Sequence, residues 1–386
     1  MCERSRRLYD DCMKQRAHAW VALRALKMVD DWGGAPELTE LLSYYLSDVW
    51  DGAWLPDIRI VDMGYGHIFK MDSDPEFIYQ KLPEELWYIK SDKDLASLLV
   101  GNRLCLEYVK GFEELAQPYR THPVEGGHLP NRVIALSHTI GDMLKMSDFP
   151  LAAYAQKKGQ VKRVRNASGS MTILDLSSRA IKDLSSSPNF SARQIALMFF
   201  LISHYICDAH MPLHCDLRDM SARSEKTSKK ERRLPESLHP WIEEYWEKCF
   251  PAKEDLILTD YTEETLDEIL VKKMPEGSII EIDKDGSNYA LSEKVESRLK
   301  GDEWTEMVYT TRVSYAVARK WIPKGADWFS LMPKENGDFE GHISRGEGFG
   351  DGRFVEDLKH ASNCIFHDAV ESIARIWYTS WRRFTE

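Results

Sequence analysis

Apolar residues recur at three- and four-residue spacing along most of this chain of 386 residues, while runs of alternating polar and apolar residues are few. This spacing places an apolar stripe along one face of each of a series of helices. The sequence therefore predicts an all-α fold, with helices over residues 10–30, 36–49, 94–115, 131–145, 191–208, 240–249, 262–272, 291–318 and 353–384.

Stretches rich in Gly, Pro, Ser and charge separate these helices. The residues singled out below come from both sides of several such stretches, so we interpret residues 1–386 as one domain rather than as units joined by linkers. Long connecting loops are expected near residues 52–85, 117–130, 216–237 and 323–352, and a short hairpin within 272–288.

Composition narrows the class of protein. The longest uninterrupted apolar stretch, residues 195–202, is far shorter than the roughly 20 residues that span a bilayer. The N-terminus is charged and carries no apolar signal region, so we expect a cytoplasmic protein. The seven cysteines form no paired motif, which indicates reduced thiols in a chain of this size.

A net charge of −11 argues against a chain whose whole surface binds nucleic acid. Basic residues nevertheless gather in two places, which we interpret first as solvated loops. The first cluster comprises Lys157, Lys158, Lys162, Arg163 and Arg165, and the second comprises Arg223, Lys226, Lys229, Lys230, Arg232 and Arg233.

One predicted helix carries the most informative residues. His204 and Asp208 lie four residues apart, so they project from the same helical face and can share a cation. Pro212 then ends the helix, which lets His214 turn back from the following loop.

A second pair, His239 and Glu243, repeats the four-residue spacing at the start of the next predicted helix. Such a pair alone is most often an ordinary helix contact, and His138 with Asp142 is another one in this chain. Several ligand-type residues within about forty positions are much harder to obtain by chance.

Two further signals lie upstream. His18 sits on an otherwise apolar helical face, where a buried histidine with satisfied hydrogen bonds is the ordinary interpretation. Asp57 follows a proline in a predicted loop, and His67 comes ten residues later.

Together these residues resemble the zinc-dependent phospholipase C family, whose relatives include fungal single-strand-specific nucleases and the phospholipase D that cleaves glycosylphosphatidylinositol anchors. The resemblance extends from residue 18 to residue 243, and the last third of the chain matches only as further helix. The motif that carries it is His204-x3-Asp208-x3-Pro212-Leu213-His214, followed by His239-x3-Glu243 and preceded by Asp57 and Gly66-His67.

The resemblance implies a set of zinc ligands. It assigns Asp57, His67, His204 and Asp208 to one zinc, and His214, His239 and Glu243 to a second. Asp208 would bridge toward a third zinc that His18 also binds.

Three points qualify this assignment of ligands. Asp51 is the alternative to Asp57, because nothing fixes the loop spacing. His210 is left out, because it lies two residues from Asp208 and points to another helical face. Secreted relatives complete the third site with an N-terminal Trp exposed by processing, whereas this chain begins seventeen residues before His18. Unless the N-terminus is trimmed, we expect that site to be incomplete or completed differently.

The chemistry follows from the ligands. Zinc with three protein ligands leaves room for a water, whose pKa falls to about 7. The resulting hydroxide, beside clustered cations, suits hydrolysis of a phosphodiester. Asp57 could orient or deprotonate the attacking water. The expected substrate is a phospholipid headgroup, with single-stranded nucleic acid as the alternative, which the second basic cluster between His214 and His239 modestly favours.

Other readings of the residues remain. A non-catalytic, zinc-stabilised binding module is the alternative outside the enzymes. An HD-type phosphohydrolase would need a later Asp after the doublet His367-Asp368, and none follows. A ferritin-like di-iron protein would need Glu-x2-His pairs that these histidines do not form. His360, Cys364 and His367 share a helical face, most simply as part of a core helix.

Overall fold

The computed structural model confirms the predicted all-α fold. Helices make up most of the residues that it describes, and the strands among them are two to four residues long. The described residues are 15–60, 65–72, 80–81, 103–112, 120–121, 127–146, 162–165, 171–174, 192–219, 234, 238–252, 303–322, 332–333, 339–340 and 354–385.

Apart from α3 (Pro36–Tyr44), which was predicted to extend to residue 49, the longer helices match the predicted ranges closely where the structure describes them. They are α2 (Gln15–Trp32), α3 (Pro36–Tyr44), α8 (Leu129–Met146), α11 (Ala192–His210), α13 (Leu238–Glu247), α16 (Glu303–Trp321) and α17 (Phe354–Thr385). The predicted helix over 262–272 and the hairpin within 272–288 lie outside the described residues.

Short helical turns connect the longer helices. They are η1 (Leu46–Asp48), α4 (Val49–Gly52), η2 (Pro56–Ile60), α7 (Arg103–Tyr108), α12 (Pro212–Cys215) and η4 (Leu217–Asp219). The range 36–49 was expected to be one helix, but it is divided between α3, η1 and α4. The division occurs because the backbone leaves the α-conformation at Tyr45.

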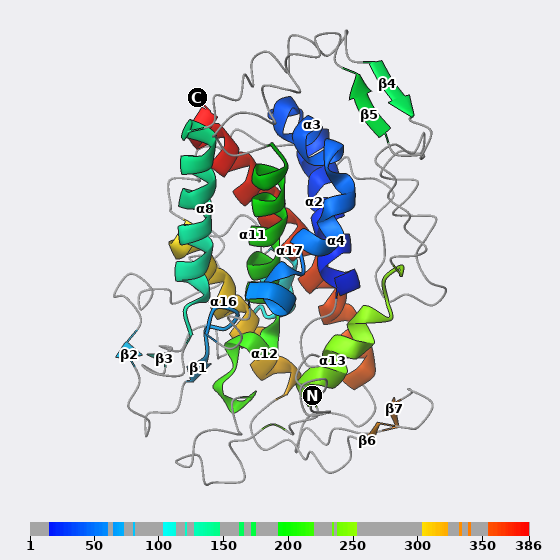
Figure 1. Cartoon of the computed structure of the whole chain (residues 1–386). Helices are drawn as coiled ribbons and strands as arrows, with labels where there is room; N and C mark the ends of the chain where they lie inside the picture. The colour runs from blue at the N-terminus through cyan, green and yellow to red at the C-terminus, as the bar shows by residue number, and fades with distance from the viewer. Residues whose placement is uncertain are drawn as a thin grey trace, which may run out of the picture.

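Helix α11 lies at the centre of the bundle and contacts α2, α4, α8, α16 and α17. Figure 1 shows it between α8 on one side and α2 on the other. Every residue from 199 to 210 is buried, which explains why this helix is apolar on more than one face. Any polar side chain on its C-terminal half must therefore find a partner inside the protein.

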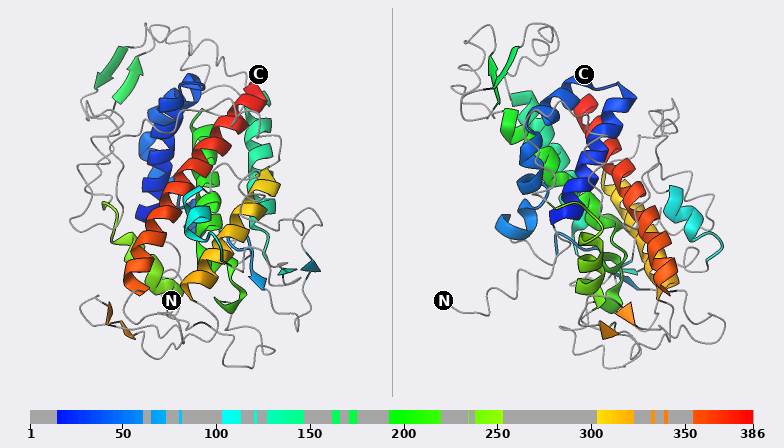
Figure 2. Two further views of the ribbon diagram at one scale, coloured as in Figure 1. Left: turned by 180° about the vertical axis from the view of Figure 1, so that it is seen from behind. Right: turned by 90° about the vertical axis from the view of Figure 1, so that its right-hand side faces the viewer.

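Helix α17 backs the bundle and runs diagonally across it (Figure 2), in contact with α2, α7, α8, α11 and α16. Its 32 residues span about 48 Å at the usual helical rise. Trp377 from this helix packs edge-on against Phe199 and Phe200 of α11. The last third of the chain thus supplies much of the core against which α11 packs.

The strands form three small antiparallel sheets. They pair β1 (Met71–Asp72) and β2 (Gln80–Lys81) with β3 (Arg120–Thr121), β4 (Lys162–Arg165) with β5 (Met171–Leu174), and β6 (Met332–Pro333) with β7 (Phe339–Glu340). The loop interpretation of the first basic cluster is wrong for Lys162, Arg163 and Arg165, which lie on β4, paired with β5. The second cluster lies outside the described residues.

Two expectations from composition can be compared with the described residues. Among them, no helix combines the length and the apolar character needed to cross a membrane. Five of the seven cysteines are described, and all five are buried free thiols: Cys105, Cys207, Cys215, Cys249 and Cys364.

Backbone hydrogen bonds join the segment 65–72, which carries His67, to the start of α8 and to α12. The Leu129 N–H at the start of α8 donates to the Ile68 carbonyl at 3.2 Å, and the Phe69 N–H donates to the His214 carbonyl at 3.1 Å. Gly127 makes this approach possible, because a Cβ at that position would meet the Ile68 carbonyl oxygen at 2.0 Å.

The variant Gly127→Ala tests this close approach. Gly127 has a φ of +88° and Gly111 a φ of +72°, but a Cβ at Gly111 meets nothing within 4 Å. We expect Gly111→Ala to cost about 1–2 kcal/mol from left-handed strain alone. Gly127→Ala should lower the free energy of unfolding by at least about 1 kcal/mol more, because the segment must move. Denaturant unfolding measures both, and equal losses would contradict the close approach.

Candidate metal centre

The structure brings all eight predicted ligand residues together in three groups. Within each group one ligand atom from each residue lies within 4.8 Å of the others. The groups found among the described residues are His18 with Asp57 and His204, His67 with His204 and Asp208, and His214 with His239 and Glu243. His204 belongs to two of them.

Six separate segments supply these side chains. His204 and Asp208 come from α11, His239 and Glu243 from α13, His18 from α2, Asp57 from η2, His67 from the segment 65–72, and His214 from α12. Both pairs with four-residue spacing lie on one helix each, as the sequence predicted.

Two residues lie in a different local structure from the one expected. Asp57 was expected in a loop, but it lies on η2, a short π-helical turn. His214 was also expected in a loop, but it lies on α12, whose first residue is Pro212. Helix α11 does end just before this proline, which fits the first position of a new helix because it has no N–H to donate there.

His204 is oriented by a hydrogen bond to the backbone. Its Nδ1–H donates to the Ala53 carbonyl at 2.8 Å. This bond fixes the ring so that Nε2 faces the other ligands. Nε2 lies 3.3 Å from Oδ1 of Asp57 and 3.2 Å from Oδ2 of Asp208.

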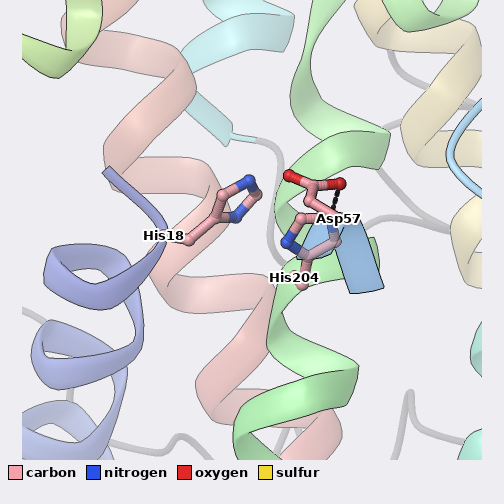
Figure 3. Close-up of side chains that lie close together, drawn as sticks. All are labelled: His18, Asp57 and His204. Atoms are coloured by element: carbon pink, nitrogen blue, oxygen red, sulfur yellow. Dashed lines mark ion pairs between the residues drawn. The ribbon is translucent and has the colours of Figure 1, made fainter. Parts of the chain in front are cut away.

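The ring of His18 packs against the face of the His204 ring. The two rings are stacked with centroids 4.0 Å apart, and Figure 3 shows His18, Asp57 and His204 pointing toward one another from three elements. Neither ring nitrogen of His18 has a hydrogen-bond partner. Burial, together with the neighbouring His204, lowers the pKa of His18 well below its usual value, so its imidazole is neutral and suited to bind a metal.

Asp208 connects the three groups. Its Oδ2 lies 2.7 Å from Nδ1 of His67, and its Oδ1 lies 3.6 Å from Nδ1 of His214 and 3.8 Å from Nε2 of His18. Burial alone would raise the pKa of this carboxyl, but His204 and His214 hold it well below the usual range. The ionised carboxylate can therefore bridge cations on either side of it.

His239 lies between two carboxylates. Its Nε2 is 2.9 Å from Oε1 of Glu243, and its Nδ1 is 2.9 Å from Oδ2 of Asp219. Burial would lower the pKa of His239, but Asp219 and Glu243 raise it to about 10. His214 completes this group, with its Nε2 3.7 Å from Oε1 of Glu243.

The sequence analysis missed Asp219 and its partner Lys70. Asp219 lies in a stretch without helical periodicity, twenty residues before His239. Lys70 donates to the same carboxylate at 2.8 Å from a segment 149 residues away. No spacing in the sequence relates these residues, so only the fold reveals them.

Several buried polar atoms of the centre have no hydrogen-bond partner. They are Nδ1 and Nε2 of His18, both carboxylate oxygens of Asp57, Nδ1 of His214, and Oε2 of Glu243. Each such atom costs about 1–3 kcal/mol when it is left unpaired. These atoms belong to the His18–Asp57–His204 and His214–His239–Glu243 groups, so a metal ion in each of these two groups would bind one such atom from each residue that has them. Imidazole nitrogens and carboxylate oxygens are ligands that suit zinc.

Asp57 lies beside two predicted ligand sets. It was assigned to the zinc of His67, His204 and Asp208, and its Oδ1 lies 3.8 Å from Nδ1 of His67 and 3.3 Å from Nε2 of His204, but it also groups with His18. Asp51, the alternative to Asp57, belongs to none of the groups found among the described residues. His210 bonds Ser372 on α17 at 2.9 Å instead. His360, Cys364 and His367 form no ligand group in the described part of the chain.

Comparisons of this chain with protein-family models, curated proteins and solved structures give no match. The resemblance to the phospholipase C family thus stays a prediction that rests on the residues described above.

Alanine variants test the grouping. We expect His214→Ala to remove about one bound ion per chain and His204→Ala about two, because His204 is shared by two groups. His138→Ala is the matched control, since His138 has the same spacing to Asp142 but is exposed on α8. Elemental analysis of untagged protein, purified without chelators or added zinc, gives the count. Wild-type metal content in His204→Ala would contradict the grouping.

Zinc affinity should rise with pH. Asp208 and Asp57 outweigh the effect of burial and raise the pKa of His204, as Asp219 and Glu243 do for His239. Metal binding needs neutral imidazoles, so zinc must displace these protons. Below both pKa values, each displaced proton increases the apparent affinity about tenfold per pH unit. Chelator competition from about pH 6 to about pH 8 measures the slope, and calorimetry in buffers of different ionisation enthalpy counts the protons. An affinity independent of pH would contradict this.

Proposed function

We propose that this protein is a zinc-dependent phosphodiesterase that resembles the phospholipase C family. The observation that carries the proposal is the convergence of five imidazoles and three carboxylates from six segments, joined by the single carboxylate of Asp208. Buried ligand atoms without hydrogen-bond partners support metal ions as the missing partners.

Charge favours an anionic substrate. The groups contain three carboxylates and five histidines, so two divalent ions leave a formal excess of one positive charge, and three ions leave an excess of three. A phosphodiester carries one negative charge that grows on the equatorial oxygens during displacement. Cations clustered in a buried site stabilise that charge much more than water does.

Two or three zinc ions would be held by His18, Asp57, His67, His204, Asp208, His214, His239 and Glu243. When bound there, zinc supplies a Lewis acid that polarises phosphoryl oxygens and lowers the pKa of water. The chain itself supplies the geometry, because the Ala53 carbonyl and the Asp219 carboxylate orient two of the imidazoles.

Asp57 is the residue that we assign to proton transfer. Neither of its oxygens accepts a hydrogen bond, although Oδ1 lies 3.3 Å from Nε2 of His204. An oxygen that is not bound to metal can accept a proton from the attacking water and orient it.

Exposure also indicates where the substrate enters. The His239 side chain is 17% exposed, and His214 and His67 keep smaller exposed fractions, while His18, His204 and Asp208 are each 1% exposed. The substrate therefore approaches from the side of His239, His214 and His67.

A phospholipid headgroup is our first choice of substrate, and single-stranded nucleic acid is the second. Both offer the phosphodiester that the centre would stabilise. The second basic cluster, six residues from Arg223 to Arg233, lies between His214 and His239 in the sequence, which favours a polyanion. These six residues lie outside the described residues, so the choice between the two depends on the assay.

Three substrates separate the possibilities: a phosphocholine lipid in vesicles, a single-stranded oligonucleotide, and a small chromogenic phosphodiester. We expect zinc-dependent turnover of at least the small diester. Asp57→Asn should lower kcat by about 10²–10⁴, the usual contribution of a proton-transfer group. His138→Ala should keep wild-type activity. Zinc content is measured on each variant, so that loss of metal is distinguished from loss of proton transfer.

Each outcome assigns the centre a role. Turnover of the lipid but not of the oligonucleotide supports a phospholipase, and turnover of the oligonucleotide but not of the lipid supports a nuclease. Bound zinc without turnover of any of the three would overturn the proposal in favour of a non-catalytic, zinc-stabilised binding module.

A further inference from the structure

Lys70 is a buried cation next to the candidate metal centre. It is 2% exposed and lies three residues after His67 in the segment 65–72. Its Nζ donates to the Leu213 carbonyl and to Oδ2 of Asp219. Burying an ammonium group costs several kcal/mol unless it is paired and hydrogen-bonded, so these two contacts keep the side chain at this position.

Asp219 connects Lys70 to the predicted zinc ligand His239. The same oxygen that accepts from Lys70 lies 2.9 Å from Nδ1 of His239. Because Nδ1 points to this carboxylate, Nε2 faces Glu243 and the rest of its group. Lys70, Asp219 and His239 thus form a buried chain of contacts that sets the orientation of the His239 ring.

Lys70 also fixes the position of His214. The Leu213 carbonyl that it binds belongs to the residue just before His214, and the Phe69 N–H donates to the His214 carbonyl itself. One short stretch, residues 69–70, therefore holds both α12 and, through Asp219, the start of α13. All of these contacts join groups of the chain itself.

We propose that Lys70 and Asp219 are positioning residues for the His214–His239–Glu243 group. They hold His239 and His214 in the orientation that binds zinc, and in the described part of the chain their own hydrogen bonds reach no ligand of the other two groups. This inference rests on the metal centre of the proposed function. The ligand groups differ in what orients their histidines. A neutral carbonyl, that of Ala53, orients His204, whereas the charged Lys70–Asp219 pair orients His239.

The test compares Lys70→Met and Asp219→Asn with Arg218→Met. Arg218 is a buried cation of the same short segment, paired with Asp216 at 2.6 Å and bonded to the Ile322 carbonyl at 2.7 Å. These partners include none of the eight ligands, so Arg218→Met removes a buried cation of this segment without removing a contact of His239. Asp219→Asn keeps the shape of the side chain and removes only its charge.

Two readouts follow each variant: stepwise Zn²⁺ dissociation constants by chelator competition, and the visible absorption of the Co²⁺-substituted protein. We expect Lys70→Met and Asp219→Asn to weaken the binding of one ion by about 10–100-fold, the usual effect of losing a partner of a ligand. The Co²⁺ bands of that ion should change while the remaining bands keep their wild-type positions. Arg218→Met should lower the unfolding temperature and leave all Zn²⁺ dissociation constants unchanged.

Unchanged Zn²⁺ binding in both variants would overturn the inference, as would equal weakening of every ion. If Lys70→Met does not fold, Asp219→Asn decides alone. A wild-type protein that binds zinc but hydrolyses no phosphodiester would defeat the proposed function and leave this test intact. A wild-type protein that binds no zinc would defeat both, since no group would then be positioned.

Discussion

The carboxylate of Asp208 is the interaction on which the candidate site depends. It is 1% exposed, at the buried end of α11, and its two oxygens face histidines from four segments. A buried carboxylate without partners would cost several kcal/mol, so these imidazoles, or cations that they bind, must surround it. The requirement explains why α2, the segment 65–72 and α12 all approach α11 near the same turn.

The apolar core offsets the cost of this polar centre. On its other faces α11 packs against aromatic residues of α17, among them Trp377 against Phe199 and Phe200, and such contacts stabilise the fold through buried area and favourable ring geometry. From the sequence, the C-terminal helix was predicted only as a helix without a role in the site. The site nevertheless depends on it. The helix holds α11 in place while the polar turn of α11 remains available for ligands.

The sequence predicted those parts of the site whose geometry a helix defines by itself. His204 with Asp208, and His239 with Glu243, needed only the four-residue spacing. The resemblance to a known family added His18, Asp57 and His67, which share no local pattern. Lys70 and Asp219 could not be predicted from either source, because their contact joins two segments without periodicity that only the tertiary fold brings together. The turn at Asp57 was missed because short π-helical turns have no strong sequence signal.

Protons can offset part of the negative charge of the centre. Carboxylates raise the pKa of His204 and His239 above the usual value, despite burial, so they favour the protonated form of both rings when no metal is bound. Two imidazolium charges then oppose the three carboxylates of the groups, much as a divalent ion would. These protons keep the ligands close together, which lowers the ordering cost that metal binding must overcome. Zinc would then replace protons in a site that is already assembled, rather than fold the site around itself.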